Sequence, residues 1–261
     1  MDDFPQDATK AYNNNSSTGI GTTSAFEDLW PNKGDFDMND LVILYKFNAI
    51  TNAQNVVVKI VGNLTLKATG GSISNGFGVQ FPLLPQSVSN LQGATLEAGQ
   101  DKAVIILFKD DHKEMPYWNT EPGMLESPQV NYLVSFDVIN GPKLIDFGTD
   151  YNPFIFNYLG QSRREIHQFG KPPTTLADPS VFGTGDDNTN IAAGRYYVSK
   201  NGLPFVMALP VAGFNYPVEG VDITKAYLHF AEWAKSGGLL FPDWYYNLSS
   251  GYRNNAFIYV K

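Results

Sequence analysis

The alternation of apolar and polar residues is the strongest pattern along this chain. In residues 56–68 valine, isoleucine, leucine and alanine fall on one face, while lysine, asparagine and threonine occupy the other. A glycine pair at 70–71 ends the run, as expected where a half-buried β-strand ends. The alternation resumes in residues 77–81, which we expect to form the return strand of a hairpin.

Other short runs are rich in β-branched and aromatic residues, which favour strands. Gly, Pro, Asn and Asp clusters separate them, as turn residues do. The pattern predicts an all-β protein, a two-sheet antiparallel β-sandwich with long ordered loops. These runs are LVILYKF (41–47), AVIILF (103–108), YLVSFDV (132–138), FIF (154–156), RYYVS (195–199), PFVMAL (204–209) and AFIYV (256–260).

One segment in the C-terminal half has helical rather than strand periodicity. Asp222 is a suitable N-cap, and a glycine pair at 237–238 marks the expected C-terminus. We therefore expect one short amphipathic helix packed on the β core. Residues 161–190 are rich in Pro, Gly, Thr and Asp, and we expect an ordered loop anchored by Phe169 and Phe182. The apolar stripe of the helix is Ile223, Ala226, Tyr227, Phe230 and Ala234.

The first residues differ in character from the rest of the chain. Asp2, Asp3 and Asp7 surround a Phe–Pro pair and resemble the last turn of an aspartate-rich, calcium-binding repeat of the thrombospondin type 3 kind. The alternative is a polar N-terminal tail. We expect residues 1–23 to be the end of such a repeat or a linker, and residues 24–261 to form a single domain.

Composition narrows the possible functions. Acidic residues outnumber basic ones by 26 to 18, which leaves no basic surface for nucleic acid or anionic lipid. The absence of cysteine and the presence of only three histidines exclude thiolate sites and disfavour zinc or iron centres. No apolar run approaches the ~20 residues of a membrane span. We expect any export signal or lipid anchor to lie outside this sequence.

The stretch SAFEDLWPNKGDFDMNDLV (24–42) carries the clearest candidate chemistry. Oxygen ligands alternate along DFDMND, as calcium-binding loops require, but the glycine and glutamate that an EF-hand needs are replaced by Asp40 and Lys46. The upstream acid pair can fold back over the intervening turn. We expect a closed calcium cage that fixes the start of the strand at 41–47, whereas the alternative is a set of solvated turn caps. The expected ligands are Glu27, Asp28, Asp35, Asp37, Asn39 and Asp40.

A second loop, GTGDDNTN (183–190), is a weaker cation candidate through Asp186, Asp187, Asn188 and Asn190, although such residues also cap turns. Catalysis would need an acid and a base. Such pairs could come from the segment DDHKE, with Asp110, Asp111, His112 and Glu114, or from Glu165 and His167. A charged hairpin tip and a paired structural histidine are the alternatives. The sequence has no nucleophile elbow, HExxH motif or P-loop.

Several motifs in order resemble the LruC domain family, which comprises bacterial surface lipoproteins and exported proteins and includes domains of unknown function in Bacteroidetes. Met38 stands where this family would have an aromatic residue, and we expect its side chain to point into the core. The resemblance implies export or surface exposure, without an established reaction. The motifs are AFEDLWPNKGDFDMNDLV (25–42), residues 55–82, NPFIF (152–156), RREIH (163–167), residues 171–205, residues 217–238 and PDWYYN (242–247).

These observations predict a non-catalytic, exported cell-surface or extracellular binding or adhesion module stabilised by calcium. Its partner would be an extracellular glycan or protein. The first alternative is a carbohydrate-binding or carbohydrate-active domain, in which Trp118, Trp233 and Trp244 line a sugar-binding groove. The second alternative is a purely structural surface or matrix component.

Overall fold

The computed structural model describes residues 2–260, which fold into two antiparallel sheets with few and short helices. The larger sheet has seven strands in the order β12-β2-β3-β4-β9-β6, and β1 pairs with a separate part of β3. Its strands are β1 (Tyr12–Asn15), β2 (Thr22–Phe26), β3 (Leu41–Thr51), β4 (Val57–Thr69), β6 (Val88–Gln92), β9 (Val130–Val138) and β12 (Val206–Leu209).

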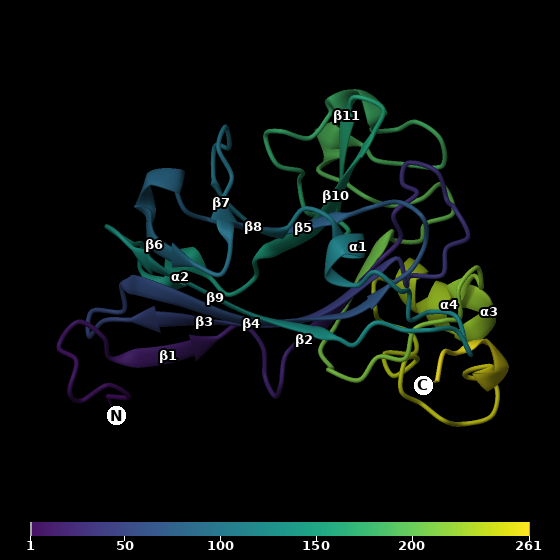
Figure 1. The fold of residues 1–261 in the computed structure, drawn as a ribbon, viewed down its shortest axis with the longest axis horizontal. Helices are drawn as coiled ribbons and strands as arrows, with labels where there is room; N and C mark the ends of the chain where they lie inside the picture. The colour runs from purple at the N-terminus through teal and green to yellow at the C-terminus, as the bar shows by residue number, and fades with distance from the viewer. Residues whose placement is uncertain (1, 261) are drawn as a thin grey trace.

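The smaller sheet has five strands in the order β11-β10-β5-β8-β7. Figure 1 shows the two sheets as separate layers, with β3, β4 and β9 in one and β5, β8 and β10 in the other. The strands of the smaller sheet are β5 (Gly76–Phe81), β7 (Thr95–Leu96), β8 (Ala103–Phe108), β10 (Asn152–Leu159) and β11 (Ser162–His167).

Aromatic side chains join the two sheets across the core. Phe81 of the smaller sheet lies 5.4 Å from Phe47 and 5.3 Å from Phe136 of the larger sheet, measured between ring centroids. Phe26 and Phe77 meet in the same way at 6.3 Å. Edge-to-face packing of this kind adds to the stability that burial of the rings provides. The predicted all-β sandwich is therefore confirmed.

The central pair of strands shows how closely the sequence pattern reports burial. Along β4, Ile60, Leu64 and Leu66 are buried as the alternation predicts. At its start, however, Val57 is buried in place of its two valine neighbours, because the register with β3 shifts between Ile50 and Thr51. A β-bulge of this kind moves the next side chains to the opposite face.

The expected hairpin between residues 56–68 and 77–81 is wrong. β5 pairs with β10 and β8 and makes no ladder with β4. The segment from Gly70 to Asn75 carries the chain from the larger sheet to the smaller one. Alternation identified the strand correctly, but a period of two cannot distinguish a neighbour in the same sheet from a strand in the facing sheet.

The expected single helix is also corrected, because residues 222–238 form two short helices, α3 (Ile223–Ala226) and α4 (Phe230–Lys235). Between them, Tyr227 forms an isolated bridge with Arg253, and the Leu228 N–H donates to the Tyr252 carbonyl at 2.9 Å. These tertiary hydrogen bonds replace helical ones. The remaining helices are single turns, at α1 (Asp111–Glu114), α2 (Leu144–Phe147), η1 (Pro85–Ser87), η2 (Pro179–Val181), η3 (Ile191–Ala193) and η4 (Asn255–Phe257).

Two of the expected strands do not form. In residues 195–199 Tyr197 has a φ of 54°, which interrupts an extended chain and leaves isolated bridges. Residues 256–260 begin in η4, where the Asn254 side chain accepts a hydrogen bond from the Ala256 N–H. Within the described residues, no helix is long and apolar enough to cross a membrane.

The remaining differences concern the long loop and the N-terminal segment. The expected loop at 161–190 contains β11, and Phe169 is exposed rather than anchored, whereas Phe182 packs against Trp30 at 5.0 Å. At the N-terminus, β1 belongs to the larger sheet, and β2 spans the boundary expected at residues 23–24.

Candidate cation site

The acidic loop is the connection between β2 and β3. Phe26 and Leu41 form the last pair of this ladder, so Glu27 and Asp40 directly follow and precede the paired strands. The Asp28 N–H donates to Asp40 Oδ2 at 2.8 Å, which closes the base of the loop. The apolar strands thereby hold two acidic side chains at fixed positions beside the core.

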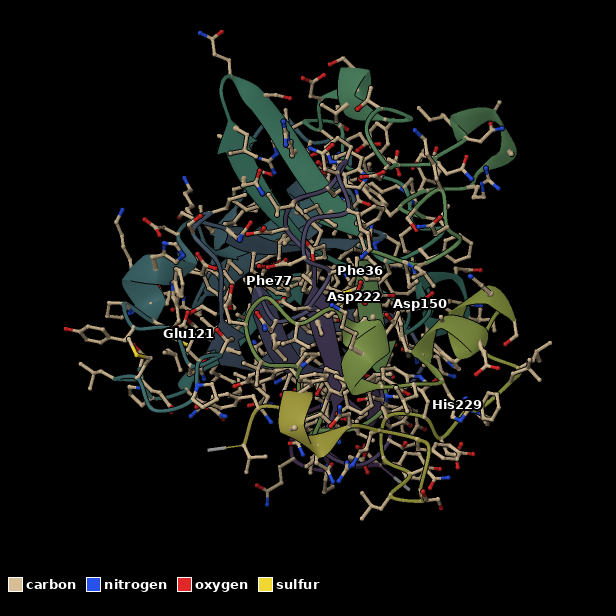
Figure 2. The ribbon with its side chains drawn as sticks, turned by 90° about the vertical axis from the view of Figure 1, so that its right-hand side faces the viewer. Phe36, Phe77, Glu121, Asp150, Asp222 and His229 are labelled. Atoms are coloured by element: carbon tan, nitrogen blue, oxygen red, sulfur yellow. The ribbon has the colours of Figure 1, made fainter. Side chains whose placement is uncertain are left out.

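Within the loop, apolar and polar side chains take opposite directions. Phe36 and Met38 have φ values of 62° and 58°, and both are fully buried. Phe36 packs against Phe205 and Phe230, and its carbonyl accepts a hydrogen bond from Ile223 at the start of α3. Figure 2 shows Phe36 near the middle of the molecule, beside Asp222. The predicted inward orientation of Met38 is confirmed.

Three carboxylates converge on the polar side of this loop. Glu27, Asp37 and Asp40 are all buried, and each offers an oxygen within 4.8 Å of those of the other two. Glu27 Oε2 and Asn39 Oδ1 are buried as well and have no hydrogen-bond partner. None of the ion pairs among residues 2–260 involves these side chains. Unpaired buried oxygens are costly, so this arrangement favours either protonation of the carboxylates or a positive ligand.

Burial and mutual repulsion make these carboxyl groups weak acids. Burial, followed by repulsion from neighbouring carboxylates, raises the pKa of Glu27 and of Asp40 well above the usual range. Burial likewise raises the pKa of Asp37 to about 8 and that of Asp28 to about 7. Without a cation the cluster therefore holds protons near neutral pH, and a bound cation would displace them.

A second group of carboxylates lies on the outer side of Asp37. Oxygens of Asp35, Asp37 and Glu219 lie within 4.8 Å of one another, and Asp35 is exposed. Thr120 Oγ1 donates to Glu219 Oε2 at 2.7 Å, and the Gly71 N–H donates to Oε1 at 3.2 Å. Sequence reasoning missed Glu219. The only local signal is an acid in the turn VEGVD, and nothing in its spacing connects it to a loop about 180 residues earlier.

Glycines allow the backbone to approach these oxygens. A Cβ on Gly70 would lie 2.4 Å from Asn39 Oδ1 and 2.6 Å from Glu219 Oε2. A Cβ on Gly34, whose φ is 63°, would lie 2.4 Å from Glu27 Oε1. Any side chain at these two positions would therefore displace a candidate ligand.

The acidic network continues along the crossover between the sheets. The Asn75 side chain donates to Asp28 Oδ2 at 2.7 Å, and its backbone N–H donates to Asp111 Oδ1 at 2.8 Å. Burial raises the pKa of Asp111 to about 7. The segment expected as a charged hairpin tip thus forms α1 instead, with Asp111 fully buried, while Asp110 binds Ser74 and Lys113.

The six side chains expected to form one cage therefore do not all meet at one position. Glu27, Asp37 and Asp40 meet at the buried position, whereas Asp35 is on the exposed side with Asp37 and Glu219. Asn39 Oδ1 lies near Glu219 Oε2, on the same side of Gly70, and Asp28 belongs to neither group and accepts a hydrogen bond from Asn75. The donors are carboxylates and one amide, which fits a hard cation such as calcium. Asp28, Asp35, Asp40 and Glu219 also line a cavity of about 220 Å³ that has Trp118 on its wall.

The second loop has a different arrangement. Asp187 accepts hydrogen bonds from the Gly183 N–H at 2.8 Å and from Thr189 Oγ1 at 2.9 Å. Asp186 accepts from the Lys33 N–H, and Asn190 accepts from the Ala193 N–H. Three of the four candidate side chains therefore cap backbone groups, and a cation in this loop stays a prediction.

The three tryptophans do not line one groove, which corrects the expected ligand surface. Trp118 is half-buried on the wall of the acidic cavity. Trp233 lines a separate cavity of about 340 Å³ beside β12, and Trp244 is fully buried in the core. The helical stripe and the segment 242–247 pack against each other, which removes Trp244 from solvent.

Glu165 and His167 form a buried pair, joined at 3.1 Å. Arg163 Nε donates to Glu165 at 2.8 Å, and Thr174 donates to it through both its N–H and its hydroxyl. Burial alone would raise the pKa of Glu165, but the hydrogen bonds and charges of His167 and Arg163 lower it to about 2. Protein groups therefore satisfy the hydrogen-bonding capacity of Glu165 and His167, as expected for the alternative of a paired structural histidine.

Comparison with known families gives one match by sequence. A family model described as a domain of unknown function, DUF4842, matches residues 55–245. The chain belongs to the DUF4842 family. The region matched in this DUF4842 chain contains Glu219, Asn75 and Trp118 but begins after the acidic loop. The matching family model is not named LruC, so membership of the LruC domain family stays a prediction.

One solved structure is similar in fold to this DUF4842 chain. It is described as a putative lipoprotein from Bacteroides ovatus, with a TM-score of 0.70 and 19% sequence identity over 93% of this chain and 75% of that one. At 19% sequence identity, the similarity shows that the two chains share a fold and nothing more. No curated protein matches the sequence.

Proposed function

We propose that this chain is a non-catalytic, exported surface module that binds an extracellular partner, and that calcium stabilises it at the β2–β3 loop. The observation that carries the calcium assignment is the buried meeting of Glu27, Asp37 and Asp40, in which Glu27 Oε2 has no hydrogen-bond partner. Glu27, Asp37 and Asp40 would hold the ion. Calcium would supply the positive charge that these buried carboxylates lack.

The proposed surface role is supported by the fold comparison rather than by the geometry of the cation site. The solved structure with the same fold is described as a putative lipoprotein, and the proposed surface location rests on that likeness. The acidic composition and the oxygen-only donor set suit calcium-rich surroundings. A module of this kind uses the ion to hold its loops, leaving the adjacent surface to meet the partner.

Thermal unfolding with and without calcium tests the assignment. A cation that binds only the folded state stabilises it by about 2.7 kcal/mol at a hundred-fold excess over its Kd. For a domain of this size, we expect calcium to raise Tm by roughly 5–10 °C relative to protein in EGTA. Elemental analysis must confirm that EGTA removed the metal. An unchanged Tm after verified removal overturns the calcium assignment.

Magnesium provides the matched ionic control. It requires a near-ideal octahedral shell and gives up water reluctantly, whereas calcium accepts irregular oxygen ligands. We expect magnesium at the same concentration to produce a much smaller shift of Tm. Protease treatment of intact cells that produce the full-length protein tests the surface location separately, since an external domain is cleaved and an internal one is protected.

A further inference from the structure

We propose that Asp35, Asp37 and Glu219 hold a second, exchangeable calcium ion, and that this ion binds vicinal hydroxyl groups of a neutral carbohydrate whose ring packs on Trp118. The inference rests on the proposed function, because Asp37 belongs to both groups of carboxylates. The extracellular partner of the surface module is then a neutral carbohydrate.

The two groups differ in their access to solvent. Glu27 and Asp40 on the inner side are buried, whereas Asp35 is exposed and Glu219 is partly exposed. Asp37 accepts one backbone hydrogen bond at each carboxylate oxygen, from Asn39 at 3.1 Å and from Gly220 at 2.8 Å. Each oxygen keeps a further lone pair, so one carboxylate can bridge two ions.

An unsatisfied amide oxygen points toward the outer group. Asn39 is fully buried, and its Oδ1 has no hydrogen-bond partner. The Asn39 amide nitrogen donates to the Pro217 carbonyl at 3.0 Å, which fixes the direction of the side chain. Asn39 Oδ1 and Glu219 Oε2 lie on the same side of Gly70, at 2.4 Å and 2.6 Å from its Cβ position. Asn39 Oδ1 has no protein donor within reach and can therefore bind a cation held by the outer group.

Two of the three outer carboxylates, Asp35 and Glu219, border an open cavity. The cavity of about 220 Å³ is lined by carboxylates and also by Leu29, Ile73 and Trp118. Trp118 also borders a second hollow of about 270 Å³, together with Tyr117, Met124 and Leu125. Tyr117 is 53% exposed, and Met124 and Leu125 are exposed too. An ion with open coordination positions therefore lies beside an extended aromatic and apolar surface.

Carbohydrate is the ligand class that fits both halves of this surface. Calcium takes six to eight oxygen ligands, and two adjacent sugar hydroxyls can replace two of its waters. The apolar face of a sugar ring packs on an aromatic side chain such as Trp118. Asp28, Asp35, Glu121 and Glu219 border the two hollows and would repel an anionic ligand, which favours a neutral sugar.

Calcium stoichiometry tests the ion separately from the sugar. We expect isothermal titration to show two calcium ions per chain, with Asp35→Asn reducing the number to one while the calcium-dependent rise in Tm remains. Asp146→Asn removes an exposed carboxylate elsewhere and should leave both ions in place. One ion in the parent chain, with Tm still raised, overturns this inference and leaves the proposed function standing. No calcium binding at all overturns both.

Sugar binding is then measured with the intact chain on a glycan array and by titration with methyl mannoside, methyl galactoside and methyl fucoside. We expect binding in calcium that is lost in EGTA. Asp35→Asn and Trp118→Ala should each weaken binding at least ten-fold. Phe169→Ala removes an exposed aromatic ring beside the other cavity and should have no effect. Absence of calcium-dependent binding to neutral glycans, or capture of a protein partner through this face instead, overturns the carbohydrate assignment.

Discussion

The acidic loops at 27–40 and 183–190 contain the same residue types but use them differently. In the second loop, Asp187 accepts hydrogen bonds from Gly183 and Thr189 of its own turn. In the first loop, Glu27 Oε2 and Asn39 Oδ1 are buried and accept none. Spacing alone could not separate a turn from a cation site. The difference lies in these two oxygens, which no protein donor satisfies, because Asp37 of the first loop also accepts backbone hydrogen bonds.

The comparison also shows what a carboxylate does for stability in each place. A capping carboxylate stabilises its turn by itself, through hydrogen bonds to nearby N–H and hydroxyl groups. A carboxylate in the buried cluster repels its neighbours and is held there by the surrounding strands. Its contribution to the free energy of unfolding is unfavourable without a cation and favourable with one. Stability measurements with and without calcium can therefore distinguish the two loops.

Neutralising one acid in each loop should give the largest difference between the loops, in both calcium affinity and Tm. We expect Asp37→Asn to weaken calcium binding by at least ten-fold, since it removes a charged ligand shared by both groups. In EGTA at pH 8, the same change should raise Tm, because it removes a buried repulsion. Calorimetry and thermal unfolding with and without calcium measure both effects.

Asp187→Asn is the matched variant in the second loop. It should leave calcium affinity unchanged and reduce stability by about 1 kcal/mol, in EGTA and in calcium alike, because charge-assisted hydrogen bonds are weakened. A large loss of calcium affinity in Asp187→Asn would show that the second loop also binds the ion. Equal behaviour of the two variants would remove the distinction drawn between the loops.

The pH dependence of the metal-free protein should be the next largest effect. The folded-state pKa values of Glu27, Asp28, Asp37 and Asp40 are raised, to about 7 for Asp28 and about 8 for Asp37. The folded state therefore binds more protons than the unfolded chain between pH ~4 and these values, and stability falls as pH rises through this window.

Thermal unfolding in EGTA from pH 4 to pH 9 measures this effect. Excess calcium should abolish or reverse the decline, since the ion binds the deprotonated carboxylates. Acids paired with protein groups behave oppositely, as the low pKa of Glu165 illustrates. A metal-free protein whose Tm rises steadily over this range would contradict the assigned pKa shifts.

Two glycines provide the finest comparison. Gly34 and Gly183 have similar φ values of 63° and 71°, so alanine is strained at both by about 1 kcal/mol. A Cβ at Gly34 would meet Glu27 Oε1 at 2.4 Å, whereas the nearest atom at Gly183 is 3.7 Å away. Gly34→Ala should therefore weaken calcium binding in addition to lowering Tm, while Gly183→Ala should lower Tm only. Calcium titration of the two variants separates ligand displacement from backbone strain.

The sequence predicted those features that depend on local periodicity. Alternation identified β4 and β5, and runs of β-branched and aromatic residues identified β3 and β8. The inward position expected for Met38 is likewise observed. The N-cap at Asp222 was predicted as well, and its carboxylate accepts from the Thr224 N–H. In each case the signal and the structure lie within a few residues of each other.

Features that depend on distant partners could not be read in this way. Glu219 joins the site through Gly71 and Thr120, far from it in sequence. The break between α3 and α4 arises from hydrogen bonding to residues 252–253. β5 lies in the smaller sheet, and the crossover that leads to it passes close to the acidic loop at Gly70 and Gly71, which the alternation of β4 and β5 does not reveal.

The wide separation of the segments that build the acidic site also bears on the time course of folding. Residues 27–40, 70–75 and 219–220 must all be in place before the oxygens converge, and such long-range contacts form late because closing long loops is entropically costly. Interactions absent from the transition state act mainly on the unfolding rate. We therefore expect calcium to slow unfolding in stopped-flow experiments while leaving the refolding rate nearly unchanged. An ion held in this way would make the native lifetime, and with it resistance to extracellular proteases, depend on the surrounding calcium concentration.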